Sequence, residues 1–248
     1  DDYDALSGLI ACTTNVKNAA MLSDSNFTMQ TLNIGMNDFI PSNEHTKYFT
    51  PLHGYEYNDT VYIFAKKEGG GVNTRTYLAK FTMPTLQYLS IDSFNFNNTN
   101  YGYTVFSDTA KGFCFIYGLY QPNVTSDNAM YLARFSLTTP HSQWQFYHPT
   151  IWYTQASSAL SIASIPGENF SIRKIQETYV LLTQQAGKAC NKGTELYAQT
   201  GATEYGPFAN FNLIYSITDR IGGNSPKTYG ISLHPQFLNS SNEVLATY

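Results

Sequence analysis

The sequence predicts an all-β fold, a β-propeller with five blades of four antiparallel strands each. Three observations predict it. The 248-residue chain is rich in aromatic residues (15%, with 20 Tyr and 16 Phe) and poor in charged ones (13%), a composition that favours strands. A short pattern of polar turn and apolar strand returns several times along the chain. The repeats also show no alternation of strands with helical segments, which would predict a parallel sheet.

The repeated unit is a polar turn followed by an apolar strand, and it is clearest at 58–67. Similar units occupy 110–117, 176–183 and 241–248, and a weaker copy occupies 7–13. One apolar residue of each copy can be aligned, which gives spacings of 52, 52, 66 and 65 residues. The aligned residues are Leu9, Val61, Phe113, Tyr179 and Val244.

Three further strands accompany each apolar strand. The strand that follows it carries a Tyr-Leu-Ala-Lys/Arg-Phe phrase at 75–81 and 129–135, with looser copies at 194–199 and 18–23. A shorter strand comes next, at 28–34, 87–91, 143–147 and 212–217. Another strand precedes the apolar one, at 49–57, 101–107, 170–175 and 228–238. Each unit therefore predicts four short antiparallel strands.

A single four-stranded unit cannot bury both of its faces, so we expect the units to stack around an axis as blades. The alternative is a β-sandwich, which also has many short strands, but the repeated phrase favours the propeller. We predict one propeller domain over 1–248, with blades at 1–45, 46–98, 99–150, 151–220 and 221–248. The last blade is incomplete because the sequence stops inside a strand. We therefore expect the chain to be a fragment, a proteolytic product or the resolved part of a longer polypeptide.

Composition and charge exclude several classes of function. The net charge of -4 is small and spread out, which argues against nucleic acid as a partner, since a nucleic-acid binder would show a basic stripe. No apolar run reaches the ~18–20 residues that span a bilayer, so we expect no membrane span.

Metal and cofactor motifs are missing from the sequence. Cys12, Cys114 and Cys190 are far apart and odd in number, which allows one disulfide plus a free thiol, or none. The five histidines show no i,i+4 helical spacing, so a zinc site is not expected. The glycines at 69–71 are not followed by the Gly-Lys-Ser/Thr of a phosphate loop, and no Gly-X-Ser-X-Gly occurs. We expect no metal and no cofactor.

Secretion is predicted from glycosylation sequons and from the acidic start of the chain. Chance alone gives roughly four Asn-X-Ser/Thr motifs in such a sequence, so their number is a weak argument, but several fall in turn-like stretches where a glycan could sit. The start Asp-Asp-Tyr-Asp looks like a mature or trimmed N-terminus. We expect a secreted, extracellular glycoprotein. The predicted glycosylation sites are Asn26, Asn58, Asn97, Asn123, Asn169 and Asn239.

The repeated phrases resemble a known family. Tyr131-Leu-Ala-Arg-Phe is followed by Gln143-Trp-Gln-Phe and Trp152, and Tyr179-Val-Leu-Leu-Thr-Gln is followed by Tyr205-Gly-Pro-Phe. These phrases resemble the five-bladed propeller glycosidases of the arabinanase and furanosidase type. More closely, the chain resembles an uncharacterised secreted propeller domain related to them. The resemblance spans about 46–248, and more faintly 1–45.

The resemblance implies a catalytic pair of carboxylates at one end of the propeller channel. Glycoside hydrolysis needs two such groups, one acting as acid and the other as base or nucleophile. Glu168 lies where the family's general acid would be. The partner would fall near the N-terminus, at Asp1, Asp2 or Asp4, or just upstream of this sequence, and we take Asp4 as the candidate. The alternative is that these aspartates are only an acidic end of the chain. The second-blade aspartate of the family has no counterpart, because Leu52 stands at its position.

Three further residues are candidates for binding substrate, namely His53, Arg173 and His234. Histidine donates hydrogen bonds to sugar hydroxyls, and the planar fork of arginine binds anionic sugars. The alternatives are a packed core residue for His234 and an outward-facing one for Arg173. The first hypothesis for function is a glycoside hydrolase-like propeller that binds a polysaccharide or other glycan in its axial funnel. The second, favoured by Leu52, is a non-catalytic glycan- or protein-binding or structural component of an extracellular assembly, with an extracellular protein as partner.

Overall fold

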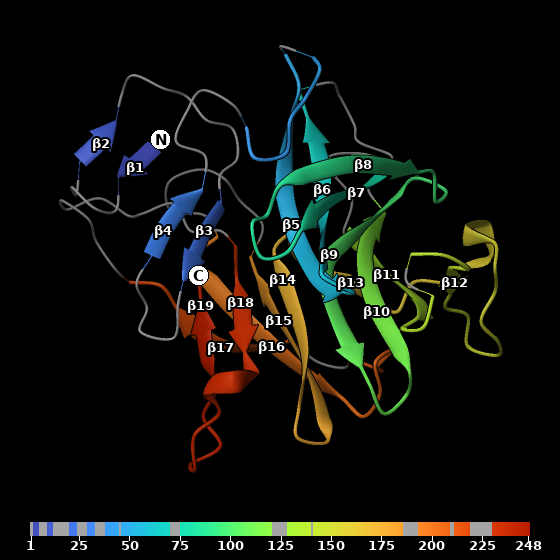
Figure 1. Ribbon diagram of the computed structural model, residues 1–248. Coiled ribbons are helices and arrows are strands. Elements are labelled where there is room, and N and C mark those ends of the chain that lie inside the picture. The colour runs from blue at the N-terminus through green and yellow to red at the C-terminus, as the bar shows by residue number, and fades with distance from the viewer. Residues whose placement is uncertain are drawn as a thin grey trace.

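The computed structural model describes residues 2–4, 9–11, 20–23, 29–32, 38–44, 46–69, 75–120, 128–139, 141–185, 193–208, 211–218 and 230–248. In this part the chain consists of antiparallel strands and two short 3-10 turns, with no α-helix (Figure 1). The expectation of an all-β fold is confirmed.

The first four-stranded sheet runs in the order β5-β6-β7-β8, so each strand pairs with the next one along the chain. Its strands are β5 (Tyr48–Tyr57), β6 (Thr60–Glu68), β7 (Thr76–Thr82) and β8 (Tyr88–Phe94). Asn58 and Asp59, with φ of 48° and 55°, make the two-residue turn from β5 to β6. Tight hairpins need this left-handed backbone, and Asn and Asp adopt it more readily than other residues with side chains.

Two further sheets repeat this order. The second runs β9-β10-β11-β12 and is extended by β13, which also pairs with β11. Its strands are β9 (Thr99–Asp108), β10 (Phe113–Tyr120), β11 (Asn128–Ser136), β12 (Gln145–Phe146) and β13 (Ala163–Ile165). The third sheet runs β14-β15-β16-β17. Its strands are β14 (Phe170–Ile175), β15 (Thr178–Gln184), β16 (Glu195–Gly201) and β17 (Asn212–Ser216).

Three two-stranded pairs complete the described strands. They join β1 (Asp2–Asp4) to β2 (Leu9–Ala11), β3 (Ala20–Ser23) to β4 (Met29–Leu32), and β18 (Ser232–His234) to β19 (Leu245–Thr247). The 3-10 turns are η1 (Ala156–Ser158) and η2 (Pro235–Phe237).

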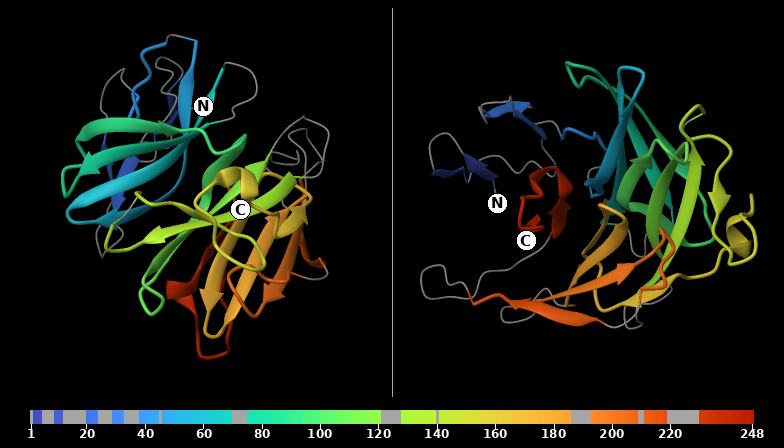
Figure 2. Two further views of the ribbon diagram at one scale, coloured as in Figure 1. Left: turned by 90° about the vertical axis from the view of Figure 1, so that its right-hand side faces the viewer. Right: turned by 90° about the horizontal axis from the view of Figure 1, so that it is seen from below.

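The first strand of each sheet lies nearest to a common axis. β5 contacts β9, β9 contacts β14, and β14 contacts β18, although none of these pairs belongs to one sheet. The sheets fan out from these strands, as the right-hand view of Figure 2 shows.

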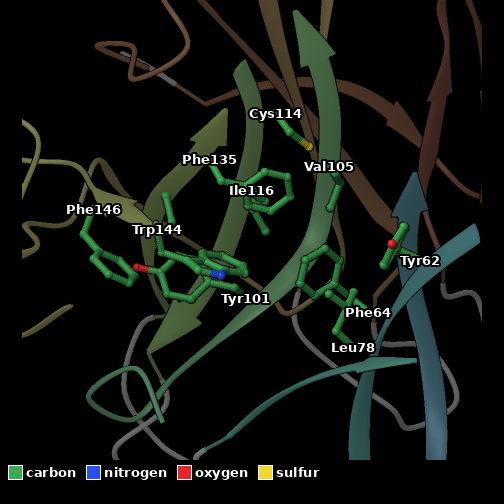
Figure 3. Close-up of a cluster of buried hydrophobic side chains, with 11 residues drawn as sticks. Tyr62, Phe64, Leu78, Tyr101, Val105, Cys114, Ile116, Phe135, Trp144 and Phe146 are labelled. Carbon is green, nitrogen blue, oxygen red and sulfur yellow. The ribbon is translucent and has the colours of Figure 1, made fainter. Parts of the chain in front are cut away.

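The core lies between the sheets. The cluster between the first and second sheets is drawn in Figure 3 and combines Tyr62, Phe64 and Leu78 with Tyr101, Ile116, Phe135 and Trp144. The cluster between the second and third sheets combines Phe115, Tyr117 and Leu132 with Phe170, Ile172 and Leu181. Neighbouring residues of β10 thus face opposite ways, as the period of a strand requires, and both faces of the second sheet are buried. A two-layer sandwich would bury only one face of each sheet, so the sandwich alternative is excluded and the fold is a β-propeller. The number of blades, five, stays a prediction.

The predicted strands differ from the observed ones at a few places. The innermost strands expected at 49–57, 101–107 and 170–175 are β5, β9 and β14. The strand expected at 228–238 is only β18, because Pro235 starts the turn η2. The short strand expected at 143–147 is only β12, since Gln143 has a left-handed backbone (φ 48°).

Strand β17 is unusual in its exposure. All five of its residues are exposed, including Leu213, Ile214 and Tyr215. It pairs with β16 on one side, and no described strand pairs with its other edge.

Candidate functional site

Glu168 lies two residues before β14, at the N-terminal end of the third sheet's innermost strand. This is the end at which the resemblance placed a general acid. Its side chain is 37% exposed, so solvent reaches the carboxylate. The structure shows what surrounds it.

Lys66 of β6 joins Glu168 to a second carboxylate. Its Nζ lies 3.2 Å from Glu168 Oε2 and 3.4 Å from Glu68 Oε1, so these two oxygens are at most about 6.6 Å apart, the sum of the two distances. Lys66 and Glu68 lie two positions apart on β6 and therefore point to the same side of the strand. Because the second sheet separates the first from the third, a contact between Lys66 and Glu168 must lie close to the axis.

The Lys66 ammonium is held charged by its two partners. Burial alone lowers the pKa of Lys66, but the negative charges of Glu168 and Glu68 more than offset this, and the pKa is raised. The lysine side chain is 15% exposed, while those of the glutamates are 37% and 33% exposed. The cation thus lies beneath two more accessible carboxylates.

Tyr103 of β9 brings the second sheet to the same place. Its ring stacks on Phe170 at 5.8 Å between centroids. Its hydroxyl oxygen is buried and has no hydrogen-bond partner among the described residues. Burial first, and then the charges of Glu168 and Glu68, raise the pKa of Tyr103. We call Lys66, Glu68, Tyr103 and Glu168 the axial cluster.

A bulge in β9 sets the direction of Tyr103. Tyr101 pairs with Gly118 and Thr104 pairs with Tyr117, which leaves Gly102 and Tyr103 as extra residues. Gly102 has φ of +111°, and a Cβ there would lie 2.2 Å from Cβ of Phe64. Only glycine fits, so the bulge, which turns a side chain in a new direction, depends on this position.

His53 and Arg173 form a second contact across the axis. A guanidinium nitrogen of Arg173 on β14 donates to Nε2 of His53 on β5, and another donates to the carbonyl oxygen of Ile172 at 2.8 Å. His53 also lies in a bulge, between the paired residues Pro51 and Gly54. Burial first, and then the Arg173 charge, lower the pKa of His53 to about 3, so its imidazole is neutral at physiological pH. Burial also lowers the pKa of Arg173 to about 10.

The other predicted site residues lie elsewhere. His234 on β18 contacts Thr247 Oγ1 at 3.0 Å and has no hydrogen bond to the axial cluster among the described residues. Asp4 is in β1, opposite Leu9, and its side chain lies outside what the structure describes. Leu52, at the position of the missing aspartate, packs against the core between the first and second sheets. The structure thus joins Glu168 to Lys66 and His53 to Arg173 across the innermost strands, whereas the side chain of His234 hydrogen-bonds only to Thr247 among the described residues.

The predicted glycosylation sites differ in their surroundings. Asn58, Asn97 and Asn239 are exposed, and the first two have left-handed backbones in turns. Asn169 is half-buried, and its Nδ2 donates to Gln184 Oε1 at 3.5 Å. Asn26 and Asn123 lie outside the described residues. The three exposed sites have room for a glycan.

Sequence reasoning missed Lys66, Glu68 and Tyr103. Lys66 and Glu68 share one side at the end of an apolar strand, where two charges break the apolar pattern, and this signal could have pointed to them. Tyr103 is one of 20 tyrosines and carries no such signal. Their partners are also distant in sequence, with Lys66 and Glu168 separated by 102 residues.

The cluster has a chemistry of its own. Carboxylate pairs in glycosidases lie roughly 5–9.5 Å apart, and the limit of about 6.6 Å between Glu68 and Glu168 is compatible with that range. Carboxylate oxygens accept hydrogen bonds and an ammonium group donates them. The arrangement therefore suits the binding of hydroxyl groups.

Comparison with known families identifies the chain. Residues 8–248 match the family described as "Domain of unknown function (DUF5005)". The chain belongs to this family. The match includes all three complete sheets of the DUF5005 chain and every residue of the axial cluster. No curated protein matches the DUF5005 chain.

Solved structures share the fold of the DUF5005 chain. A "putative hydrolase" from Bacteroides ovatus ATCC 8483 is 20% identical with a TM-score of 0.60, over 81% of this chain and 54% of the other. An exo-1,5-alpha-L-arabinanase from a bovine ruminal metagenomic library is 14% identical with a TM-score of 0.51, over 87% of this chain and 76% of the other. The DUF5005 chain thus spans about half the length of the first protein. At these identities the likeness establishes the fold, which agrees with the arabinanase-type propeller expected from the sequence.

The described residues of the DUF5005 chain contain no group of three or more His, Cys, Asp or Glu side chains placed to hold a metal ion. Nor do they contain a helix of the length and apolar character needed to cross a membrane.

Proposed function

We propose that the DUF5005 chain is a secreted, carbohydrate-active propeller that binds a glycan at the axial cluster. The observation that carries the proposal is the meeting of Lys66, Glu68, Tyr103 and Glu168, from three sheets, where two solvent-accessible carboxylates pair with one lysine ammonium group. Sugar hydroxyls would donate hydrogen bonds to these carboxylates.

The His53–Arg173 contact joins two of the innermost strands, β5 and β14, on which the proposed site also depends. A neutral imidazole that accepts from a guanidinium group is a fixed polar contact. Arg173 is fixed by two acceptors, since it also bonds to the carbonyl of Ile172. Pre-positioned donors of this kind reduce the entropy lost when a ligand binds.

Glycan binding is tested directly with Glu168→Gln. Purified chain is titrated calorimetrically with oligosaccharides derived from plant, fungal and bacterial polysaccharides, and any that bind are repeated with the variant. We expect the variant to bind more weakly by roughly 10-fold or more, since loss of a hydrogen bond to a charged group costs about 1.5–3 kcal/mol. Glu177→Gln is the matched control, because the side chain of Glu177 is 94% exposed and lies outside the cluster. Equal affinities for the two variants would show that the glycan binds elsewhere.

Hydrolysis is the second candidate function, favoured by the spacing of Glu68 and Glu168. It predicts release of reducing sugar from at least one polysaccharide, with a loss of roughly 100-fold or more in Glu168→Gln and in Glu68→Gln, as expected for an essential acid or base. Binding without release would leave the chain as a non-catalytic glycan-binding module. Release that survives both substitutions would remove the two carboxylates from the mechanism.

Secretion and glycosylation form a separate part of the proposal. Exposed turn positions at Asn58, Asn97 and Asn239 support it. After expression through a eukaryotic secretory pathway, enzymatic removal of N-glycans should lower the mass of the chain. Asn58→Gln should reduce this loss of mass by one glycan. An unchanged mass would contradict the prediction of glycosylation.

A further inference from the structure

A groove on the outer side of the propeller lies between the first and second sheets. It has a volume of about 470 Å³ and is formed by the segment after β8, by β12 with the two residues before it, and by Thr154 and the first residue of η1. This volume is within the roughly 300–1,000 Å³ of ordinary ligand sites. β12 is the outer strand of its sheet, and the groove shares no residue with the axial cluster. We call it the outer groove.

The floor of the outer groove is aromatic and rigid. Phe96 is half-buried, and its ring centroid lies 4.8 Å from that of Trp144 and 5.1 Å from that of Phe146. Phe94 stacks on it at 5.4 Å with an angle of 4° between the rings. Trp144 and Phe146 belong to the core cluster of Figure 3, which anchors the floor. The accessible part of Phe96 is therefore a fixed apolar surface.

The rim of the groove carries uncharged polar groups that are not otherwise engaged. Asn95, Gln143 and Thr154 are exposed, and their side chains form no hydrogen bond with another described residue. Gln145, by contrast, accepts from Arg134 Nε at 2.8 Å. None of the described residues that line the groove carries a charge.

We propose that the outer groove is a second carbohydrate site, which binds a neutral oligosaccharide apart from the axis. A sugar ring has apolar C–H faces and a periphery of hydroxyl groups, and it therefore fits an aromatic floor surrounded by amide and hydroxyl groups. Amides both donate and accept hydrogen bonds, as sugar hydroxyls do. Absence of charge at the lining selects neutral sugars over acidic ones. The groove's place on the outer surface would let a long polymer lie along the propeller.

Tryptophan fluorescence reports on this groove specifically. The chain has two tryptophans, so Trp152→Phe leaves Trp144, in the groove, as the only one. This variant, produced in bacteria and checked by circular dichroism, is titrated with arabinohexaose, xylohexaose, cellohexaose and hexagalacturonate. We expect at least one neutral hexasaccharide to change the Trp144 emission until the change saturates. Added salt should not alter this response, and hexagalacturonate should cause none. No response to any neutral sugar, or an equal response to hexagalacturonate, would overturn the proposal.

Variants of the rim complete the test. Gln143→Gly, which suits the left-handed backbone at φ 48°, and Asn95→Ala should each weaken binding roughly 3- to 10-fold, the loss of about one hydrogen bond. Gln236→Ala, which removes an exposed amide elsewhere, should leave the affinity unchanged. Glu168→Gln separates the two proposals. A response lost in Glu168→Gln but kept in Gln143→Gly would overturn the outer site and support the axial one.

Discussion

Gly102→Ala is expected to be the most damaging glycine substitution in the second sheet. The added methyl group would lie 2.2 Å from Cβ of Phe64 and 2.3 Å from its Cγ, and both atoms belong to a fully buried side chain. Overpacking of a core costs about 1–3 kcal/mol. The backbone φ of +111° adds a further cost for any side chain, about 1–3 kcal/mol. We therefore expect a loss of about 2–6 kcal/mol in the free energy of unfolding, or roughly 5–25 °C in Tm.

Gly112→Ala separates the two contributions. Gly112 also has a positive φ, +71°, but a Cβ there would meet nothing within 4 Å. Its substitution should therefore cost only the backbone term, about 1–2 kcal/mol. Urea unfolding followed by circular dichroism measures both variants against the wild type. Equal losses would refute the argument that contact with Phe64 is what requires glycine at 102. A further consequence is weaker glycan binding in Gly102→Ala, because the bulge directs Tyr103.

Three other predictions follow from the buried polar groups. Tyr103→Phe removes a buried hydroxyl without a described partner, so the free energy of unfolding should stay the same or rise by about 1 kcal/mol. A clear loss of stability would mean that the hydroxyl is already satisfied. The pKa of His53 is lowered to about 3, below the ordinary value of about 6.5, so its contribution to stability is present above pH ~6.5 and is lost as the pH falls toward 3. Urea unfolding of wild type between pH 6 and 4 should therefore be steeper in pH than that of His53→Asn, by up to about 1.4 kcal/mol per pH unit, and parallel curves would contradict this. Burial raises the pKa of the Cys114 thiol to about 12. Peptide mapping after treatment with iodoacetamide at pH 8 should therefore find Cys114 unmodified in the folded chain and modified in urea. Rapid labelling of the folded chain would show that the thiol is accessible.

The strands that could be predicted from the sequence are those defined by local patterns. β5, β9 and β14 follow from alternating apolar residues and from flanking turn residues such as Asn58 and Asp59. β13 could not be predicted, because its three residues have no period and only its pairing with β11 makes it a strand. The early end of β18 could have been predicted from Pro235, because proline has no backbone N–H to donate to a neighbouring strand.

The candidate site could be predicted only in part. Glu168 was found through a family resemblance, and His53 and Arg173 were proposed separately, whereas their contact depends on two innermost strands meeting across the axis. The bulges that place His53 and Tyr103 change the register by local geometry, which alternation in the sequence does not encode. Lys66 meets Glu168 only because three sheets converge.

The exposed strand β17 has a practical consequence. Leu213 and Ile214 are each 53% exposed, and no described strand pairs with the outer edge of β17, which carries backbone hydrogen-bonding groups. Exposed apolar edge strands recruit further chains and start aggregation. The isolated polypeptide is therefore expected to lose solubility as its concentration rises, and a lysine at position 214 would be the simplest gatekeeper for preparing it.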